Sequence, residues 1–175
     1  QPSPYATYAA GEALRRAGRL AEADTVFARL LAHPLPFPTQ PILLSRARLY
    51  YQQGRPERAQ GFVEQAIAEI GDSLDAALVF DDVKHIIGDE ELAQFLALRT
   101  PEAYQIFFHT FWVRRNPTPA RPLNVRMAEH YRRMLKAERE YVYDGFRFWY
   151  SNPDRLGALD FPPAYALNEE FNDKG

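Results

Sequence analysis

The chain has 175 residues, of which 46% are hydrophobic and 14% aromatic, and its 21 basic and 23 acidic residues give a formal net charge of −2. This composition argues against disorder, and the sequence has no run of about 18 apolar residues that would span a bilayer. Because the charges nearly balance, we expect no binding to nucleic acid or to an anionic membrane surface. The absence of cysteine excludes disulfides, thiolate catalysis and zinc–thiolate sites.

A helical hairpin is predicted at the start of the chain, and its pattern returns downstream. Apolar residues recur at three-to-four spacing over Tyr5–Ala17 and over Leu20–Ala32. Three positions recur 36 residues later at the same internal spacing: Gly18, Arg19 and Ala23 correspond to Gly54, Arg55 and Ala59. A repeat of about this length is typical of a helical solenoid. Each glycine can adopt the left-handed conformation that ends a helix, and each alanine lets the next helix approach closely.

Further positions of the two units follow a common pattern of small, large apolar and aromatic residues. They are Gly11, Leu14, Gly18, Ala23, Phe27 and Leu30 in the first unit and Ala47, Tyr50, Gly54, Ala59, Val63 and Ala66 in the second. This pattern resembles the tetratricopeptide repeat, although Thr7 and Leu43 stand where that family has a Trp-like residue. Because two units are fewer than the three or so that a free solenoid needs, we expect further helices to cap them.

Two capping helices are predicted directly after the repeats. Ser73 can cap a helix that runs to about Ile87, and Gly88 can end it. Asp89 then begins a second helix, which runs to Leu98. We expect these helices to cap the two repeats.

A third helix and a rigid corner follow. Thr100 and Pro101 predict a helix start, because threonine accepts amide hydrogens and proline is tolerated in a first turn. The helix runs to about Arg114, and its aromatic side chains cover more than half of its circumference: Tyr104, Phe107, Phe108, Phe111 and Trp112. The prolines of residues 116–119 predict a stiff, non-helical connector.

The last predicted helix extends over about Val125–Tyr143, with Asn124 as its cap. One face carries Met127, Tyr131, Met134 and Tyr141. We predict a structural joint between this helix and the preceding one, formed by Trp112, Arg115, Asn116 and Asn124. In it Arg115 holds loop carbonyls or a carboxylate and fixes the angle between two helices, with ligand recognition as the alternative.

The segment from Tyr104 to Gly145 resembles the beginning of the GWxTD domain, a bacterial family. The matching positions are Phe111, Trp112, Arg115, Asn116, Pro117, Thr118 and Pro119, then Asn124, Arg126, Glu129 and Tyr131. The Gly-Trp-x-Thr-Asp pentapeptide is absent, so the chain is either a divergent member or a piece of a longer protein. The resemblance implies an exported or envelope protein with a helical scaffold and no assigned catalytic activity.

An enzymatic or metal-binding role has weak support in the sequence. Its candidates are His109 and His130 with Glu129, Glu138 and the pair Asp81-Asp82. No second histidine stands three or four residues from either one, which a helical metal site requires. We therefore expect His109 to be packed among aromatic residues, Asp81 and Asp82 to be solvated, and no cofactor to be bound.

Two surfaces are candidates for contact with a partner protein. By analogy with tetratricopeptide repeats, the inner face of the first helices presents Tyr8, Glu12, Arg15, Arg48, Tyr51 and Gln52. The C-terminal segment is too aromatic for ordinary disorder and too rich in turn residues for a long helix, and it offers Phe148, Trp149, Tyr150, Phe161 and Tyr165.

These observations predict an all-α protein: two tetratricopeptide-like hairpins over residues 1–70, capping helices over 71–145 and an irregular aromatic, proline-rich tail over 146–175, in one structural unit. We expect a non-catalytic scaffold whose partners are other protein subunits, in a respiratory, photosynthetic or secretion complex of the bacterial envelope. The chain begins without methionine, which favours a leader or an upstream segment removed before this numbering starts. Because the resemblance to the GWxTD domain implies an exported or envelope protein, we expect a periplasmic location, with the cytoplasm as the alternative. The alternatives are a free-standing adaptor for extended peptides and a fragment of a longer protein with its activity beyond Gly175.

Overall fold

The structure is a computed structural model that describes residues 3–141, and this part of the chain is helical without strands. Its elements are α1 (Pro4–Arg16), α2 (Leu20–Leu31), α3 (Gln40–Gln52), α4 (Pro56–Ala68), α5 (Ser73–Val83), the short 3₁₀ helix η1 (Lys84–Ile86), α6 (Asp89–Ala97), α7 (Pro101–Arg115) and α8 (Val125–Tyr141). The all-α prediction is confirmed for these residues. The predicted aromatic tail lies outside the described residues.

The two hairpins, α1–α2 and α3–α4, turn in the same way. Gly18 and Gly54 have φ angles of 76° and 69°, in the left-handed region that glycine tolerates. In each turn the following arginine closes a bond from its backbone N–H to a carbonyl five residues earlier: Arg19 to Leu14 and Arg55 to Tyr50, both at 2.9 Å. The repeated Gly-Arg pair therefore ends the first helix of each hairpin in the same way.

The two helices of the first hairpin approach closely at Gly11. A Cβ atom at this position would lie 2.6 Å from Cε1 of Phe27, which is completely buried on α2. The glycine therefore makes room for the ring. Ala23 and Ala59, at equivalent positions of α2 and α4, are also completely buried, as the resemblance to a repeat pattern predicts.

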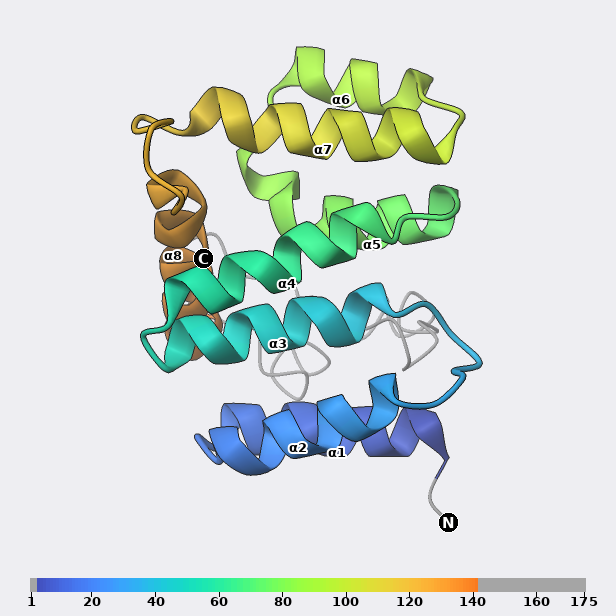
Figure 1. The fold of residues 1–175 in the computed structure, drawn as a ribbon, viewed down its shortest axis with the longest axis vertical. Coiled ribbons are helices and arrows are strands. Elements are labelled where there is room, and N and C mark those ends of the chain that lie inside the picture. The colour runs from blue at the N-terminus through green and yellow to red at the C-terminus, as the bar shows by residue number, and fades with distance from the viewer. Residues whose placement is uncertain (1–2, 142–175) are drawn as a thin grey trace, which may run out of the picture.

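The helices are stacked along the long axis of the molecule, and α8 runs along the stack (Figure 1). The hairpin α1–α2 lies at one end, followed by α3–α4, then α5, then the pair α6 and α7. α8 contacts α3, α4 and α7, so it bridges the second hairpin and the capping helices. Two clusters of buried apolar side chains form the core, and Leu31, Tyr51 and Phe62 pack against both.

The helix boundaries follow local capping, with one correction. The Thr100 side chain accepts from the backbone N–H of Ala103 at 3.3 Å, as predicted for the start of α7. α5, however, is capped by Asp72 rather than by Ser73: the Asp72 carboxylate accepts from Leu74 N at 2.8 Å and from Asp75 N at 2.9 Å. Because the Asp72 carboxylate accepts hydrogen bonds from two backbone N–H groups, Asp72 caps the helix in place of Ser73.

The aromatic residues of α7 lie where its neighbours cover it. Tyr104, Phe108, Phe111 and Trp112 are buried against α4, α5 and α8. The opposite side of this helix is open, because Ile106 and Val113 are 65% and 52% exposed. The prediction of a helix buried among neighbours is therefore right for one side only.

Two helical glycines provide a matched test of this packing. Gly11→Ala places a Cβ against Phe27, so we expect a loss of about 1–3 kcal/mol in the free energy of unfolding. Gly61→Ala in α4 meets nothing within 4 Å and removes backbone entropy from the unfolded chain, so we expect a gain of about 0.5–1 kcal/mol. Urea unfolding measures both values, and a gain in both variants contradicts the close approach at Gly11.

Candidate partner-binding site

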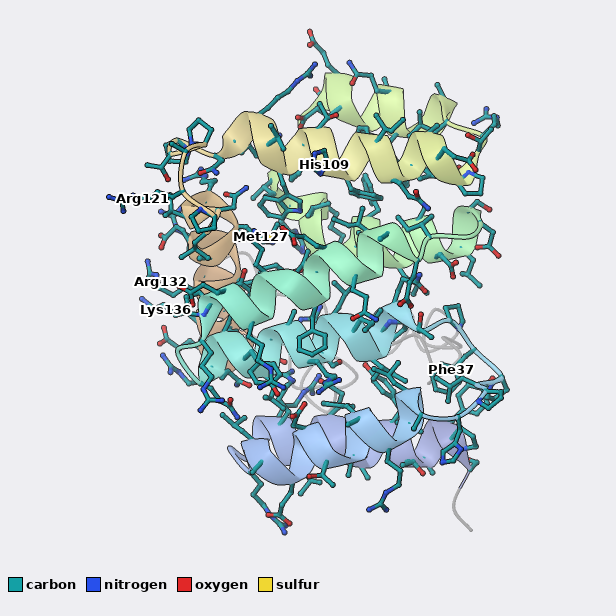
Figure 2. All side chains as sticks on the ribbon, viewed as in Figure 1. Phe37, His109, Arg121, Met127, Arg132 and Lys136 are labelled. Atoms are coloured by element: carbon teal, nitrogen blue, oxygen red, sulfur yellow. The ribbon has the colours of Figure 1, made fainter. Side chains whose placement is uncertain are left out.

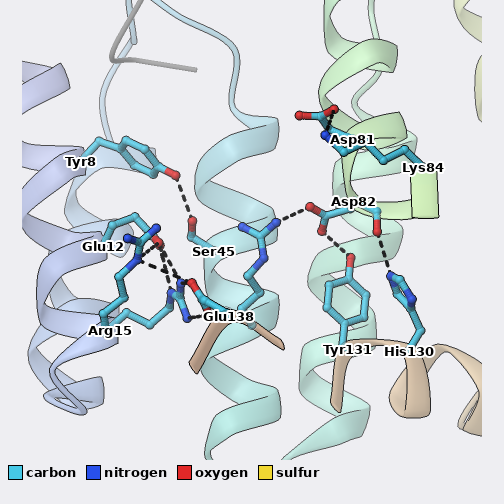
Figure 3. A network of polar contacts seen from close by, with 12 residues as sticks. Tyr8, Glu12, Arg15, Ser45, Asp81, Asp82, Lys84, His130, Tyr131 and Glu138 are labelled. Atoms are coloured by element: carbon cyan, nitrogen blue, oxygen red, sulfur yellow. Dashed lines mark hydrogen bonds and ion pairs between the residues drawn. The ribbon is translucent and has the colours of Figure 1, made fainter. Parts of the chain in front are cut away.

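Arg15 lies at the centre of a buried polar network that joins α1, α3 and α8. Its side chain is 1% exposed. It donates to the Glu12 carboxylate at 2.9 Å from Nη2, to Gln52 Oε1 at 3.4 Å from Nη1, and to Glu138 Oε2 at 3.0 Å from Nη1. Arg16 adds a contact of 3.5 Å from Nε to Glu138. One carboxylate of α8 thus receives two arginines of α1 (Figure 3).

A second buried ion pair holds α8 against α3 and α5. The Asp82 carboxylate, on a residue 2% exposed, accepts from the Arg48 guanidinium and from the Tyr131 hydroxyl, the latter at 2.8 Å. The backbone carbonyl of Asp82 is 2.8 Å from Nε2 of His130. Because a carbonyl oxygen only accepts, Nε2 carries the hydrogen. Figure 3 shows Tyr131 and His130 reaching from α8 to the two ends of this one aspartate.

Burial and pairing shift the pKa values of these groups. Burial acts to raise the pKa of Glu12, but the Arg15 guanidinium outweighs it and holds that pKa below its usual value. Burial raises the pKa values of Tyr8 and Tyr131, so both hydroxyls stay protonated. Burial lowers the pKa of His130 below its usual 6.5, which favours the neutral ring. At neutral pH, Glu12 and Arg15 are therefore charged, whereas Tyr8, Tyr131 and His130 are neutral.

The predicted inner face is covered rather than open. Tyr8, Glu12, Arg15 and Arg48 are 5%, 8%, 1% and 3% exposed. The Tyr8 hydroxyl lies 3.1 Å from Ser45 Oγ on the next hairpin. The expectation that these four side chains face a free groove is corrected, because they bond to α8, to α5 and to one another. A role for them in binding a partner stays a prediction.

The other two predicted residues, Tyr51 and Gln52, line an open groove of about 920 Å³ between the α3–α4 turn and α8. The Tyr51 ring stacks on Tyr131 with centroids 4.8 Å apart. Its hydroxyl is buried and has no hydrogen-bond partner among the described residues. The remaining lining is Arg16, Gly54, Pro56, Ala128, Arg132, Leu135, Lys136, Glu138 and Arg139. No signal in the sequence connects α8 with this surface.

The predicted joint exists, but its parts serve two different contacts. Arg115 donates to both oxygens of Glu91 at 2.7 Å and lies over the Phe111 ring, so it fastens α7 to α6. Glu91 also accepts from Gly88 N at 3.2 Å, at the start of α6. Arg115 therefore binds a carboxylate between α7 and α6, and its role in a joint between α7 and α8 stays a prediction.

The corner between α7 and α8 depends on Asn116 and Asn124. Asn116 Oδ1 accepts from Thr118 N at 3.1 Å and stabilises the turn. Asn124 Oδ1 accepts from the backbone N–H groups of Arg126 and Met127, both at 3.1 Å, as predicted for the cap of α8. Its amide donates to the carbonyl of Trp112 at 2.8 Å, which ties the start of α8 to α7.

The candidates for metal or catalytic chemistry do not gather at one site, and the contact between His130 and Asp82 uses the backbone carbonyl of the aspartate. His109 is exposed on α7 (Figure 2), where it lines a surface pocket beside Trp112, so the expectation of a packed histidine is wrong. Asp82, expected in solvent, is buried by its pairing with Arg48, while Asp81 forms a surface pair with Lys84 at 3.2 Å. No group of three or more metal-ligating side chains occurs within residues 3–141.

Two stretches of the sequence match a known family. Residues 4–29 and 40–65 match the tetratricopeptide repeat, and they coincide with the hairpins α1–α2 and α3–α4. Both hairpins are therefore similar to tetratricopeptide repeats. No curated protein and no solved structure matches the chain. The resemblance of the segment after Tyr104 to the GWxTD domain stays a prediction.

The other predicted surface, in the C-terminal segment, lies outside the described residues. Phe148, Trp149, Tyr150, Phe161 and Tyr165 belong to it. None of the helices within residues 3–141 combines the length and the apolar character that crossing a bilayer requires. The groove beside α8 is thus the candidate site that the structure describes.

The contribution of the buried Arg48–Asp82 ion pair to stability can be compared with that of the exposed Lys84–Asp81 pair. Asp82→Asn keeps the shape of the side chain but leaves Arg48 buried without its carboxylate, so we expect a loss of about 3–5 kcal/mol in the free energy of unfolding. Asp81→Asn changes an exposed pair and costs less than about 1 kcal/mol. Urea titration compares the two, and similar losses contradict a structural role for the Asp82 charge.

The lowered pKa of His130 predicts a pH dependence of stability. The unfolded histidine titrates near 6.5 and the folded one lower, so the unfolded state binds more protons between these pH values. Stability is therefore lost as pH falls through about 6.5. We expect the midpoint of thermal unfolding to fall between pH 7.5 and 5.5 in the wild type and to fall less in His130→Gln. His109→Gln, which changes an exposed ring, keeps the wild-type dependence; an unchanged slope in His130→Gln refutes the assignment.

Proposed function

We propose that this protein is a non-catalytic accessory subunit, held in a larger assembly by contacts with other proteins. The observation that carries the proposal is the pair of tetratricopeptide hairpins, because such helical repeats are protein-interaction scaffolds. The polar network supports it. Arg15 is engaged by Glu12 and Glu138, and these ions hold helices together instead of lining a reaction site.

The setting that we propose is the bacterial cell envelope, on its periplasmic side. Its support is the resemblance of the segment around Trp112 to the GWxTD domain, whose members are envelope or exported proteins. A respiratory, photosynthetic or secretion complex is the host that such a setting favours. In that host the hairpins and the groove beside α8 would contact neighbouring subunits.

A free-standing adaptor for extended peptides is the second candidate. It is favoured by the open groove, where Tyr51 and Gln52 lie beside α8. It is disfavoured by the burial of Arg48 and Arg15, which a peptide in the inner face would have to contact. The two functions differ in stoichiometry, since a subunit stays with its partners and an adaptor exchanges them.

Gentle isolation from the source organism separates these candidates. We expect the protein to co-migrate with partner chains at a fixed ratio, because scaffold contacts in a stable assembly bury large surfaces. Native mass spectrometry of the isolated particle measures the ratio. Stable migration as a monomer contradicts the subunit proposal, and a partner at variable, low occupancy favours the adaptor.

A further inference from the structure

The groove beside α8 is rich in cations although the chain as a whole is slightly acidic. Its lining contains the cations Arg16, Arg132, Lys136 and Arg139 and one carboxylate, Glu138. That carboxylate is already engaged by Arg15 and Arg16. Positive charge is therefore concentrated at this groove in a chain of formal net charge −2.

The α8 residues of the lining fall on a single stripe of that helix. Ala128, Arg132, Leu135, Lys136 and Arg139 follow one another at intervals of one, three or four residues, which places them on one face. Arg132 and Lys136 lie on the outer edge of α8 in Figure 2. From Arg132 to Arg139 the helix rises by about 10 Å, which an extended peptide covers in about three residues.

Within residues 3–141, the cations of this stripe take part in surface ion pairs. Arg132 pairs with Glu129 at 2.7 Å, and Arg139 with Glu140 at 3.0 Å, while their side chains are 67% and 75% exposed. Lys136 is 4.0 Å from Glu140. Exposed pairs of this kind contribute about 0–1 kcal/mol each, so an incoming carboxylate can replace the partner at small cost.

Apolar surface separates the charges. Leu135 lies between Arg132 and Lys136 in the stripe, and the opposite wall carries the ring of Tyr51 and Pro56. The position of both walls is fixed by the Arg15–Glu138 contact and by the stacking of Tyr51 on Tyr131. A groove with a fixed shape binds a ligand without the cost of ordering its own walls.

We propose that this groove binds an extended acidic segment of a partner protein, in which two carboxylates about three residues apart flank an apolar side chain. The carboxylates contact Arg132 and Arg139, Lys136 between them adds to the attraction, and the apolar side chain covers Leu135. The proposal rests on the scaffold function and names the chemistry of the partner. The cations come from α8, so this surface is distinct from the buried inner face of the repeats.

The composition of the groove favours a peptide over nucleic acid. Glu138 lines the groove, and Glu129 and Glu140 beside it pair with its cations. Arg132 and Arg133 lower the pKa of Glu129 to about 2, so it stays ionised. A nucleic-acid backbone carries a negative charge at every nucleotide, so these carboxylates would repel it. A peptide with separated charges and one apolar residue can avoid them.

The test is a calorimetric titration of the full chain with the peptide Gly-Glu-Ala-Phe-Glu-Gly and with its Gln-for-Glu counterpart at low salt. We expect binding of the acidic peptide, weakened at least tenfold by Arg132→Glu combined with Lys136→Glu. Arg133→Glu is the matched control: its side chain is 67% exposed and pairs with Glu129, as that of Arg132 does, but it does not line the groove. We expect less than a twofold change for it.

Several results overturn the proposal. These are equal weakening by Arg132→Glu and Arg133→Glu, equal binding of the Gln peptide, or equal binding of a single-stranded oligonucleotide or of anionic vesicles. Self-association that the double variant abolishes would assign the groove to a second copy. Absence of binding of the acidic peptide also overturns the proposal, whether the groove does not accept the peptide or residues 142–175 occupy it.

The same double variant distinguishes a failure of the groove proposal from a failure of the proposed function. A wild-type protein that is isolated as a monomer contradicts the subunit function. A wild-type assembly whose partner is retained in full by Arg132→Glu with Lys136→Glu contradicts only the groove. Circular dichroism of the variants confirms that both retain the helical fold, which we expect because the changed side chains are exposed.

Discussion

Buried ions fix α8 against the tetratricopeptide hairpins, and the rest of the structure depends on that contact. An ion that leaves water costs several kcal/mol unless its partners are well placed. Arg15 has partners from α1, α3 and α8, and Asp82 on α5 has partners from α3 and α8. Displacing α8 by one turn would separate both sets at once. Apolar contacts such as those of Met127 and Met134 tolerate sliding better, so the ions define the position and the apolar residues add stability.

The hairpins themselves follow from local rules. The left-handed glycines at 18 and 54 end one helix of each pair, and the missing side chain of Gly11 lets the first pair close on Phe27. Two such units leave the apolar side of α3 and α4 uncovered, and it is covered here by α5, α7 and α8. Local sequence therefore builds the units, while helices far along the chain complete their core.

Much of the fold could be predicted from the sequence because its signals are local. The Thr100-Pro101 start, the Asn124 cap and the repeated glycines each act within a few residues. The site could not be predicted in the same way. Glu138 lies 123 residues from Arg15 in sequence, and no periodicity links them. Asp81 and Asp82 look equivalent in the sequence, yet only Asp82 turns inward, because its partners Arg48 and Tyr131 come from other helices.

α8 has two chemically different sides, and their combination gives the groove its properties. The inner side carries Tyr131, whose hydroxyl reaches Asp82 and whose ring supports Tyr51. The outer stripe carries Arg132, Lys136 and Arg139, which are free to change partners because their ion pairs are exposed. Since the inner side is rigid, the spacing of the backbone positions that carry the outer cations is constant. A fixed spacing discriminates between ligands by the separation of their charges, whereas total charge alone gives only attraction.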